Sequence, residues 1–184
     1  VADRLNRLGH KVTVYEARDA AGGLLRYGIP DFKLQKSVID RRLEIMEAGG
    51  ICFRVNNAVG KDIEGAEIYN YYDAVCLATG AMIPRDLAVP GRNLSGIHFA
   101  LDFLMQQNKM IRGIKVPEEQ RLTAEGKHVL IIGGGDTGAD CVGTAIRQKA
   151  LSVTQIEIMP EPPSERMADN PWPYWPNVLR TSSS

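Results

Sequence analysis

A glycine-rich turn between an apolar run and a helical pattern is the part of this sequence best suited to chemistry. The apolar residues 129–132 lead into Gly133, Gly135 and Gly138, which have the spacing G-x-G-x-x-G and precede apolar residues at helical spacing. In this pattern the first glycine permits a tight turn, the second lets backbone approach a pyrophosphate, and the third lets helix and strand pack closely. Free N–H groups at the helix start attract phosphate charge. We therefore predict a dinucleotide site, with a purely structural glycine turn as the alternative.

An acidic residue, Glu16, stands where a nucleotide-binding fold holds a ribose. Residues 2–8 have the apolar spacing of a helix that a glycine ends, and residues 11–16 then alternate as a strand. In a strand–helix–strand unit, an acid at the tip of the second strand hydrogen-bonds the ribose hydroxyls of an adenine dinucleotide. A glycine pair, Gly22 and Gly23, follows shortly after. We predict that Glu16 binds a ribose; a solvated strand-end glutamate is the alternative.

The other periodic segments predict an α/β fold. Helices are expected over 35–48, 99–107 and from the glycine turn to about 148, and strands over 51–55, 72–81 and 153–159. The strand at 72–81 is expected to be buried and to end in a small-residue turn where backbone can approach a ligand. The order strand, glycine turn, helix, strand occurs once intact and once without its front. We therefore expect two Rossmann-like dinucleotide-binding domains, over residues 1–90 and 91–184.

The last predicted strand bears on which nicotinamide cofactor would bind. Aligning the alternating residues of the two halves places Pro160 where Glu16 stands, so the acid that favours a free ribose hydroxyl is absent. That absence favours NADPH, although no arginine directly follows the strand. Arg166 and Arg180 are candidates for the extra phosphate, with surface roles as the alternative. Glu157 would serve NADH if the strand had a different register.

The composition excludes several classes of partner. The 22 Lys and Arg residues balance the 22 Asp and Glu residues, which gives no electrostatic argument for nucleic acid or an anionic membrane. The apolar runs are far shorter than the ~20 residues of a membrane span, and no signal segment opens the chain. We expect a cytoplasmic protein. Because the chain starts at Val1 within a helical pattern and ends in a polar tail, we also expect a fragment of a longer protein.

Cysteine and histidine lack the spacing of a metal or redox site. Cys52, Cys76 and Cys141 are widely separated, so no C-x-x-C pair exists, and we expect them to be small buried hydrophobic residues. The three histidines are isolated from one another. The sequence therefore predicts no metal ligand and no iron–sulfur cluster built from this chain alone.

Four motifs together resemble one family. They are the glycine-rich segment 22–30, the small-residue turn 78–81, the glycine motif 133–138 and the Trp-Pro segment 169–173. Read together, they make the chain similar to the small (beta) subunit of glutamate synthase over essentially its whole length. The first motif is shared with close relatives, including the amino-terminal part of dihydropyrimidine dehydrogenase, and the Trp-Pro segment narrows the resemblance to glutamate synthase.

The resemblance implies a flavoprotein oxidoreductase with two cofactors in this region. A flavin domain, truncated here at both ends, would hold FAD, and an inserted domain would bind NADPH or NADH. Iron–sulfur clusters outside this segment would carry electrons to a large (alpha) subunit, which makes glutamate from glutamine and 2-oxoglutarate. By the same resemblance, FAD would contact Glu16, Gly22, Gly23, Leu24, Thr79 and Gly80, and the nicotinamide dinucleotide would contact Gly133, Gly135, Asp136, Thr137 and Gly138.

Hydride transfer between two cofactors asks the protein mainly to orient their rings, so no catalytic acid, base or nucleophile is predicted. Arg26 and Lys33 are candidates for stabilising cofactor charge, with surface roles as the alternative. The family's first glycine motif, its cluster cysteines and its carboxyl-terminal flavin segment are absent from this sequence. We therefore expect the isolated fragment to be inactive.

Two other functions fit the same motifs. One is another NAD(P)H–flavin reductase of the same plan, of the ferredoxin–NADP reductase or dihydropyrimidine dehydrogenase type. The other is a non-catalytic nucleotide-sensing module, which binds a cofactor only to fix a protein interface. Reduction of an added electron acceptor by NAD(P)H would distinguish either enzyme, the glutamate synthase subunit or the other reductase, from the sensing module.

Overall fold

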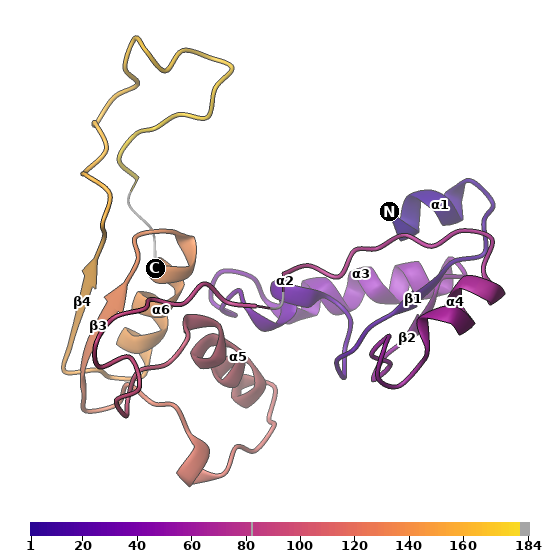
Figure 1. Ribbon diagram of the computed structural model, residues 1–184, viewed down its shortest axis with the longest axis horizontal. Helices are drawn as coiled ribbons and strands as arrows, with labels where there is room; N and C mark the ends of the chain where they lie inside the picture. Colours follow the sequence, from indigo (N-terminus) through magenta and orange to yellow (C-terminus); the bar gives the residue numbers. More distant parts are fainter. Residues whose placement is uncertain (82, 181–184) are drawn as a thin grey trace. The chain divides into compact units, whose positions relative to one another are not determined.

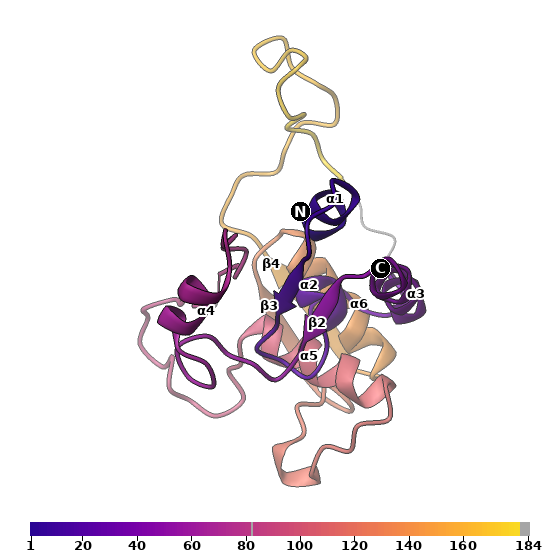
Figure 2. The ribbon, with the colours of Figure 1, turned by 90° about the vertical axis from the view of Figure 1, so that its right-hand side faces the viewer.

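The computed structural model describes residues 1–81 and 83–180, so the end of the predicted polar tail lies outside the described residues. The chain divides into two compact units, drawn from two sides in Figures 1 and 2. The first unit contains Val1–Tyr27 and Leu34–Phe99, and the second contains Gly28–Lys33 and the chain from Ala100 onward. A short segment between two parts of the first unit therefore belongs to the second.

The first unit is built around a parallel strand pair. Its helices are α1 (Ala2–Arg7), α2 (Gly23–Tyr27), α3 (Lys36–Ala48) and α4 (Gly65–Tyr71), and its strands are β1 (Thr13–Tyr15) and β2 (Cys52–Arg54). Val14 lies opposite Phe53 in the pair. Helix α3 ends before Gly50, whose φ of +98° suits the turn into β2. The predicted helices and strands up to residue 55 are thus present, whereas α2 and α4 were not predicted.

The predicted buried strand at 72–81 is not formed. Tyr72 reaches Tyr15 through a hydrogen bond between the two hydroxyls, 3.1 Å long. Beyond Tyr72 the segment has no regular structure, and the side chains of Val75 and Leu77 are 49% and 84% exposed. A strand needs a neighbour for its N–H and C=O groups, and within the described residues β1 pairs only with β2. The apolar pattern could not show whether such a neighbour exists.

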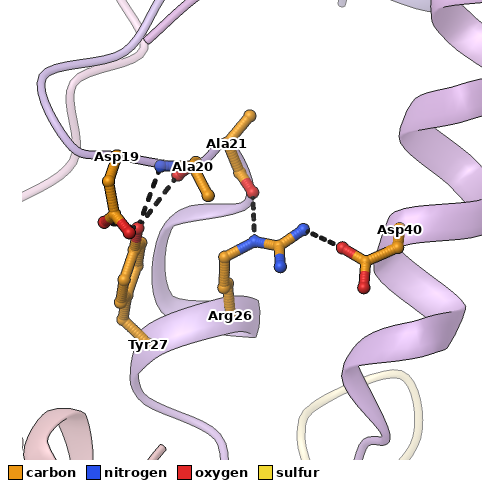
Figure 3. A network of polar contacts seen from close by, with 6 residues as sticks. All are labelled: Asp19, Ala20, Ala21, Arg26, Tyr27 and Asp40. Carbon is orange, nitrogen blue, oxygen red and sulfur yellow. Dashed lines mark hydrogen bonds and ion pairs between the residues drawn. The ribbon is translucent and has the colours of Figure 1, made fainter. Parts of the chain in front are cut away.

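Arg26 is buried in the first unit, where its guanidinium joins neighbouring segments. This corrects the prediction that Arg26 faces either a cofactor or solvent. Its residue is only 3% exposed. Its Nε donates to the backbone oxygen of Ala21 at 2.6 Å, and its Nη2 donates to Oδ1 of Asp40 at 2.6 Å (Figure 3). These contacts join helix α2 to the loop before it and to helix α3. A buried guanidinium needs such partners, because leaving it unpaired would be costly.

Tyr27 holds the same loop from the other side of α2. Its residue is 1% exposed, and its hydroxyl donates to Oδ1 of Asp19 at 2.5 Å and accepts the N–H of Ala20 at 3.1 Å (Figure 3). The loop runs from just after Glu16 to the glycine pair, so Tyr27 fixes the stretch between two groups of predicted cofactor-binding residues.

We expect Tyr27→Phe to lower the free energy of unfolding by about 1 kcal/mol, because the carboxylate of Asp19 and the N–H of Ala20 both lose their hydrogen bond to the hydroxyl. Urea denaturation followed by circular dichroism measures the change. Tyr69→Phe is the matched control, since Tyr69 is 78% exposed on α4 and should leave stability unchanged. Equal stability of wild type and Tyr27→Phe would show that the hydroxyl does not hold the loop.

The second unit contains the intact strand–helix–strand arrangement. Its elements are α5 (Ala100–Ile111), the 3₁₀ turn η1 (Glu118–Gln120), β3 (His128–Ile132), α6 (Asp136–Arg147) and β4 (Ser152–Ile156). The strands are parallel, with Leu130 opposite Thr154. Helix α6 packs on both strands and α5 packs on α6 (Figures 1 and 2), around a core of Leu104, Ile131 and Cys141. Beyond β4, residues 157–180 contain no helix or strand and form a long loop.

The segment Gly28–Lys33 is fastened to α6 of the second unit. Lys33 Nζ lies 2.6 Å from Oδ1 of Asp140, and the guanidinium carbon of Arg147 lies 3.6 Å from the ring centre of Phe32. Lys33 is an exposed residue that pairs with a largely buried carboxylate. The ion pair agrees with the surface role that the sequence allowed, and a role towards cofactor charge stays a prediction. The pairing explains why this short segment belongs to the second unit.

The cysteines were only partly predicted. Cys52 and Cys76 are exposed, because β2 has no neighbour on one edge among the described residues and residue 76 lies in the unpaired segment. Cys141 is buried, as predicted. Burial, together with the negative charge of Asp140, raises the pKa of the Cys141 thiol to about 11.

We expect the native chain at pH 8 to present two reactive thiols, Cys52 and Cys76, to a chromogenic disulfide reagent. At that pH roughly one Cys141 thiol in a thousand would be ionised, and the thiolate is the reactive form. Cys141 should react only after denaturation, as mass spectrometry of the labelled peptides can establish. Labelling of Cys141 as fast as the other two would contradict its burial.

None of the helices in the described part of the chain is long and apolar enough to cross a membrane. No group of His, Cys, Asp and Glu side chains in residues 1–81 and 83–180 could hold a metal ion.

Candidate nucleotide-binding site

The glycine turn joins β3 directly to α6. Gly133 follows the last residue of β3 and has a φ of +119°. Residues with a Cβ are strained at this φ, whereas glycine is not. The N–H of Gly133 donates to the backbone oxygen of Ile156 at 2.8 Å. Gly135 is the N-cap of α6, and the helix starts at Asp136. The strand therefore becomes a helix within the glycine stretch, as the sequence predicted.

Gly138 and Gly135 differ sharply in what surrounds them. A Cβ on Gly138 would overlap the carbonyl oxygen of Gly133 and lie 2.6 Å from Nε2 of Gln155. A Cβ on Gly135 would meet no atom within 4 Å. Gly138 is thus needed for close packing of the helix on the strands, which is the role its spacing predicts. The space beside Gly135 is open to a ligand.

The start of α6 is suited to an anion. No side chain caps its first N–H groups, and Gly135, Asp136 and Thr137 are all exposed. Uncapped N–H groups and the positive end of the helix dipole attract phosphate. The geometry therefore fits a pyrophosphate against the turn and the first residues of the helix, which are the residues predicted for the nicotinamide dinucleotide.

The structure corrects the register assigned to the strand after α6. Strand β4 ends at Ile156, opposite Ile132, so Glu157 is the first residue beyond it. In the first unit Glu16 is likewise the first residue beyond β1. Glu157, and not Pro160, is therefore the counterpart of Glu16. The signal was present in the sequence, because Glu157 follows the motif at the spacing of about 20 residues typical of a ribose-binding acid.

The predicted flavin residues near β1 lie around the loop that Arg26 and Tyr27 hold. The half-buried Glu16 accepts the N–H of Arg18 at 3.0 Å. Gly22 has a φ of +128°, and a Cβ there would lie 3.2 Å from Cγ2 of Ile39. Gly23, with a φ of +50°, begins α2. A side chain would strain both glycines, so this loop can present backbone closely to a ligand.

The other predicted flavin residues, Leu24, Thr79 and Gly80, do not gather at one place in the structure. Leu24 is 61% exposed on α2. Thr79 and Gly80 are exposed in the unpaired segment, and no described contact joins them to Glu16 or to the glycine pair. The described contacts therefore do not bring these three residues to the loop at 16–23.

A hollow of about 340 Å³ in the first unit borders the loop between Glu16 and the glycine pair, through Asp19, Ala20 and Ala21. It is lined in part by Asp19, Asp40, Glu44 and Glu47, and none of the predicted flavin residues lines it. Carboxylates on its wall would repel the phosphates of a dinucleotide. We therefore do not assign this hollow to FAD.

The family of the chain follows from comparison with known proteins. Residues 1–172 match the family described as pyridine nucleotide-disulphide oxidoreductase. The chain belongs to this family. The resemblance to glutamate synthase is also confirmed: the chain is 50% identical to "Glutamate synthase [NADPH] small chain" of Mycobacterium tuberculosis, covering 100% of this chain and 38% of that protein. It is 49% identical to "Glutamate synthase [NADH]" of Schizosaccharomyces pombe, covering 97% of this chain and 9% of that protein.

A solved structure supports the fold. The chain matches "Mycobacterium tuberculosis FprA in complex with NADPH" with a TM-score of 0.64 and 20% identity, over 84% of this chain and 40% of that one. The chain therefore shares the α/β fold of this structure. The chain spans well under half the length of the curated relatives and of this structure.

Proposed function

We propose that this chain is the cofactor-binding part of a glutamate synthase small subunit, in which FAD accepts hydride from NADPH or NADH. The observation that carries the proposal is the turn at Gly133–Gly135–Gly138, with its packed third glycine and open second glycine. The identity of about half to glutamate synthase small chains supports it. A nicotinamide and a flavin bound together would supply a hydride donor and a two-electron acceptor.

In this proposal the two units divide the cofactors between them. The second unit binds the nicotinamide dinucleotide at the start of α6, through the backbone of Gly135, Asp136 and Thr137. The first unit contributes Glu16 and the glycine pair to FAD, on the loop that Arg26 and Tyr27 hold. The residues bind and orient, and none of them transfers a proton. Leu24, Thr79 and Gly80 remain proposed flavin contacts.

Electrons would leave the flavin through iron–sulfur clusters supplied outside this chain. The receiving partner would be a large subunit or a fused large domain that makes glutamate from glutamine and 2-oxoglutarate. The names of the relatives support this partner, since the bacterial relatives are called small chains and this chain matches only 9% of the Schizosaccharomyces pombe enzyme.

A second candidate is a flavin reductase of the same plan that serves another acceptor, of the ferredoxin–NADP reductase type. The match in fold to FprA favours it. The two candidates share the nicotinamide site and differ in where the electrons go, so the partner decides between them.

The test is a chimera in which this chain replaces the matching stretch of the Mycobacterium tuberculosis small chain. We expect it to bind FAD, to lose the flavin absorbance within seconds of mixing with NADPH or NADH, and to support glutamate formation with the large subunit. Flavin reduction without glutamate formation would favour the second candidate. Bound flavin that neither nucleotide reduces would refute the oxidoreductase proposal and favour a sensing module.

A further inference from the structure

The segment 163–179, which we call the aromatic loop, is closed on itself within the second unit. The N–H of Leu179 donates to the backbone oxygen of Pro163 at 2.8 Å, so the two ends of the segment meet. A surface loop with joined ends and no regular structure is an Ω-loop, and loops of this class are frequently functional. Figures 1 and 2 show the loop projecting away from α5 and α6.

Internal hydrogen bonds hold the aromatic loop in one conformation. Nη1 of Arg166 donates to the backbone oxygens of Asn170 at 3.1 Å and of Tyr174 at 3.2 Å. The N–H of Asn177 donates to Oδ1 of Asn170 at 3.1 Å. Three prolines within 171–176 restrict the backbone further. The loop is therefore ordered before any partner arrives, and binding would cost little conformational entropy.

The outer surface of the aromatic loop carries large apolar side chains. Trp172 and Trp175 are the two tryptophans of the chain, and they are 83% and 78% exposed. Tyr174 and Met167 are exposed as well. Tryptophan is highly buried on average in folded proteins, and Trp, Tyr and Met are enriched where proteins bind one another. The loop thus has the composition of a protein interface.

The charges around these side chains indicate the character of the partner. The stretch 157–180 has more acids than bases, namely Glu157, Glu161, Glu165 and Asp169 against Arg166 and Arg180. Within the described residues, the exposed side chains of Glu165 and Asp169 form no ion pair or hydrogen bond. The two arginines are engaged, since Arg166 binds backbone oxygens and the guanidinium carbon of Arg180 lies 4.7 Å from the ring centre of Trp175. A partner would therefore meet aromatic rings beside unpaired carboxylates.

The unpaired carboxylates favour a basic protein over two other occupants. A dinucleotide would bring phosphates towards Glu165 and Asp169, and a second copy of the loop would bring the same carboxylates against them. A protein face with apolar pockets bordered by Lys and Arg would complement both the rings and the charges.

We propose that the aromatic loop is a docking surface for the protein that accepts electrons from the flavin. Trp172 and Trp175 would enter apolar pockets of that protein, and Lys or Arg at the rim of these pockets would face Glu165 and Asp169. This inference rests on the proposed function, which supplies the partner. The loop has no part in hydride transfer in that proposal, so docking and flavin reduction can be measured separately.

The experiment uses the chimera with the Mycobacterium tuberculosis small chain and measures its dissociation constant for the large subunit by surface plasmon resonance. We expect Trp172→Ala and Trp175→Ala each to weaken the complex at least about fivefold, because exposed tryptophans that fill a partner's pockets contribute strongly to binding. The rate of flavin reduction by NADH or NADPH should stay at the wild-type value. Tyr69→Ala is the matched control, since Tyr69 is 78% exposed on α4 and should leave the affinity unchanged.

A charge variant tests the basic character of the partner. We expect Glu165→Lys to weaken the complex at least about threefold at low ionic strength and less at high ionic strength, where salt screens the repulsion. Equal or tighter binding by Glu165→Lys at low ionic strength would overturn the proposal of a basic partner face.

The remaining outcomes separate the other occupants. Unchanged affinity in both tryptophan variants would overturn the inference and leave the proposed function intact. Slower flavin reduction in these variants would assign the loop to the cofactors, and a lower melting temperature of the chimera alone would assign it to the rest of the small chain. A wild-type chimera that forms dimers through the tryptophans would assign the loop to a second copy. Each of these three results would overturn the inference. A wild-type chimera that does not bind the large subunit would refute the proposed partner and this inference together.

Discussion

Gly138→Ala is expected to destabilise the second unit by about 3 kcal/mol, although alanine favours helices. The added methyl group would overlap the carbonyl oxygen of Gly133, which is backbone and cannot rotate away. Relief would require α6 to move off β3 and β4, and the core around Cys141 would loosen with it. The gain of about 1 kcal/mol in helix propensity is too small to offset this cost.

Urea denaturation of the chain, followed by circular dichroism, measures this loss. Gly65→Ala is the matched control, because Gly65 begins α4 and a Cβ there meets no atom within 4 Å. We expect the control to be as stable as wild type or slightly more so. A Gly138→Ala variant with unchanged stability would mean that helix and strand do not approach as closely as the structure shows.

Gly135→Val is expected to weaken binding of the nicotinamide dinucleotide at least about tenfold while leaving the fold intact. The backbone at Gly135 has a φ of −78° and a ψ of −177°, which valine also adopts, and its Cβ would enter open space. That space is where a pyrophosphate would approach the start of α6. The branched side chain would therefore exclude the ligand without disturbing its surroundings.

The measurement is the dissociation constant of NADH for Gly135→Val, with circular dichroism to establish that the variant is folded. Gly135→Ala should have a smaller effect, because a single methyl group fills less of the approach. Unchanged affinity in a folded Gly135→Val variant would show that the motif is only a turn.

The geometry of the glycine turn at 133–138 was predictable because the information for it is local. The glycine spacing predicts three features, and the structure has all of them. Gly133 has a positive φ, Gly138 lies close to the carbonyl oxygen of Gly133, and the helix start at Asp136 is exposed. Each of these depends on residues only a few positions apart. The same is true of helix α3, whose apolar spacing and following glycines are sufficient to place it.

The predictions that failed depended on distant residues. Strand β4 ends at Ile156, where its pairing with β3 ends. The alternation of residues 153–159 could not show this end, so it led us to assign Pro160, and not Glu157, to the first position beyond the strand. The segment at 72–81 has the composition of a strand but no neighbouring strand in the described chain. The ion pair of Lys33 could not be predicted for the same reason, because its partner Asp140 lies far along the chain.

The most direct test of the nucleotide site is a two-dimensional NMR titration of the isotopically labelled chain with NADH, following the backbone amide signals. We predict that the largest shifts fall on the glycine turn and the start of α6, at Gly134, Gly135, Asp136 and Thr137, with a further shift at Glu157. Shifts confined to other residues, or no shift at a saturating concentration, would contradict the assignment of this turn as a dinucleotide site.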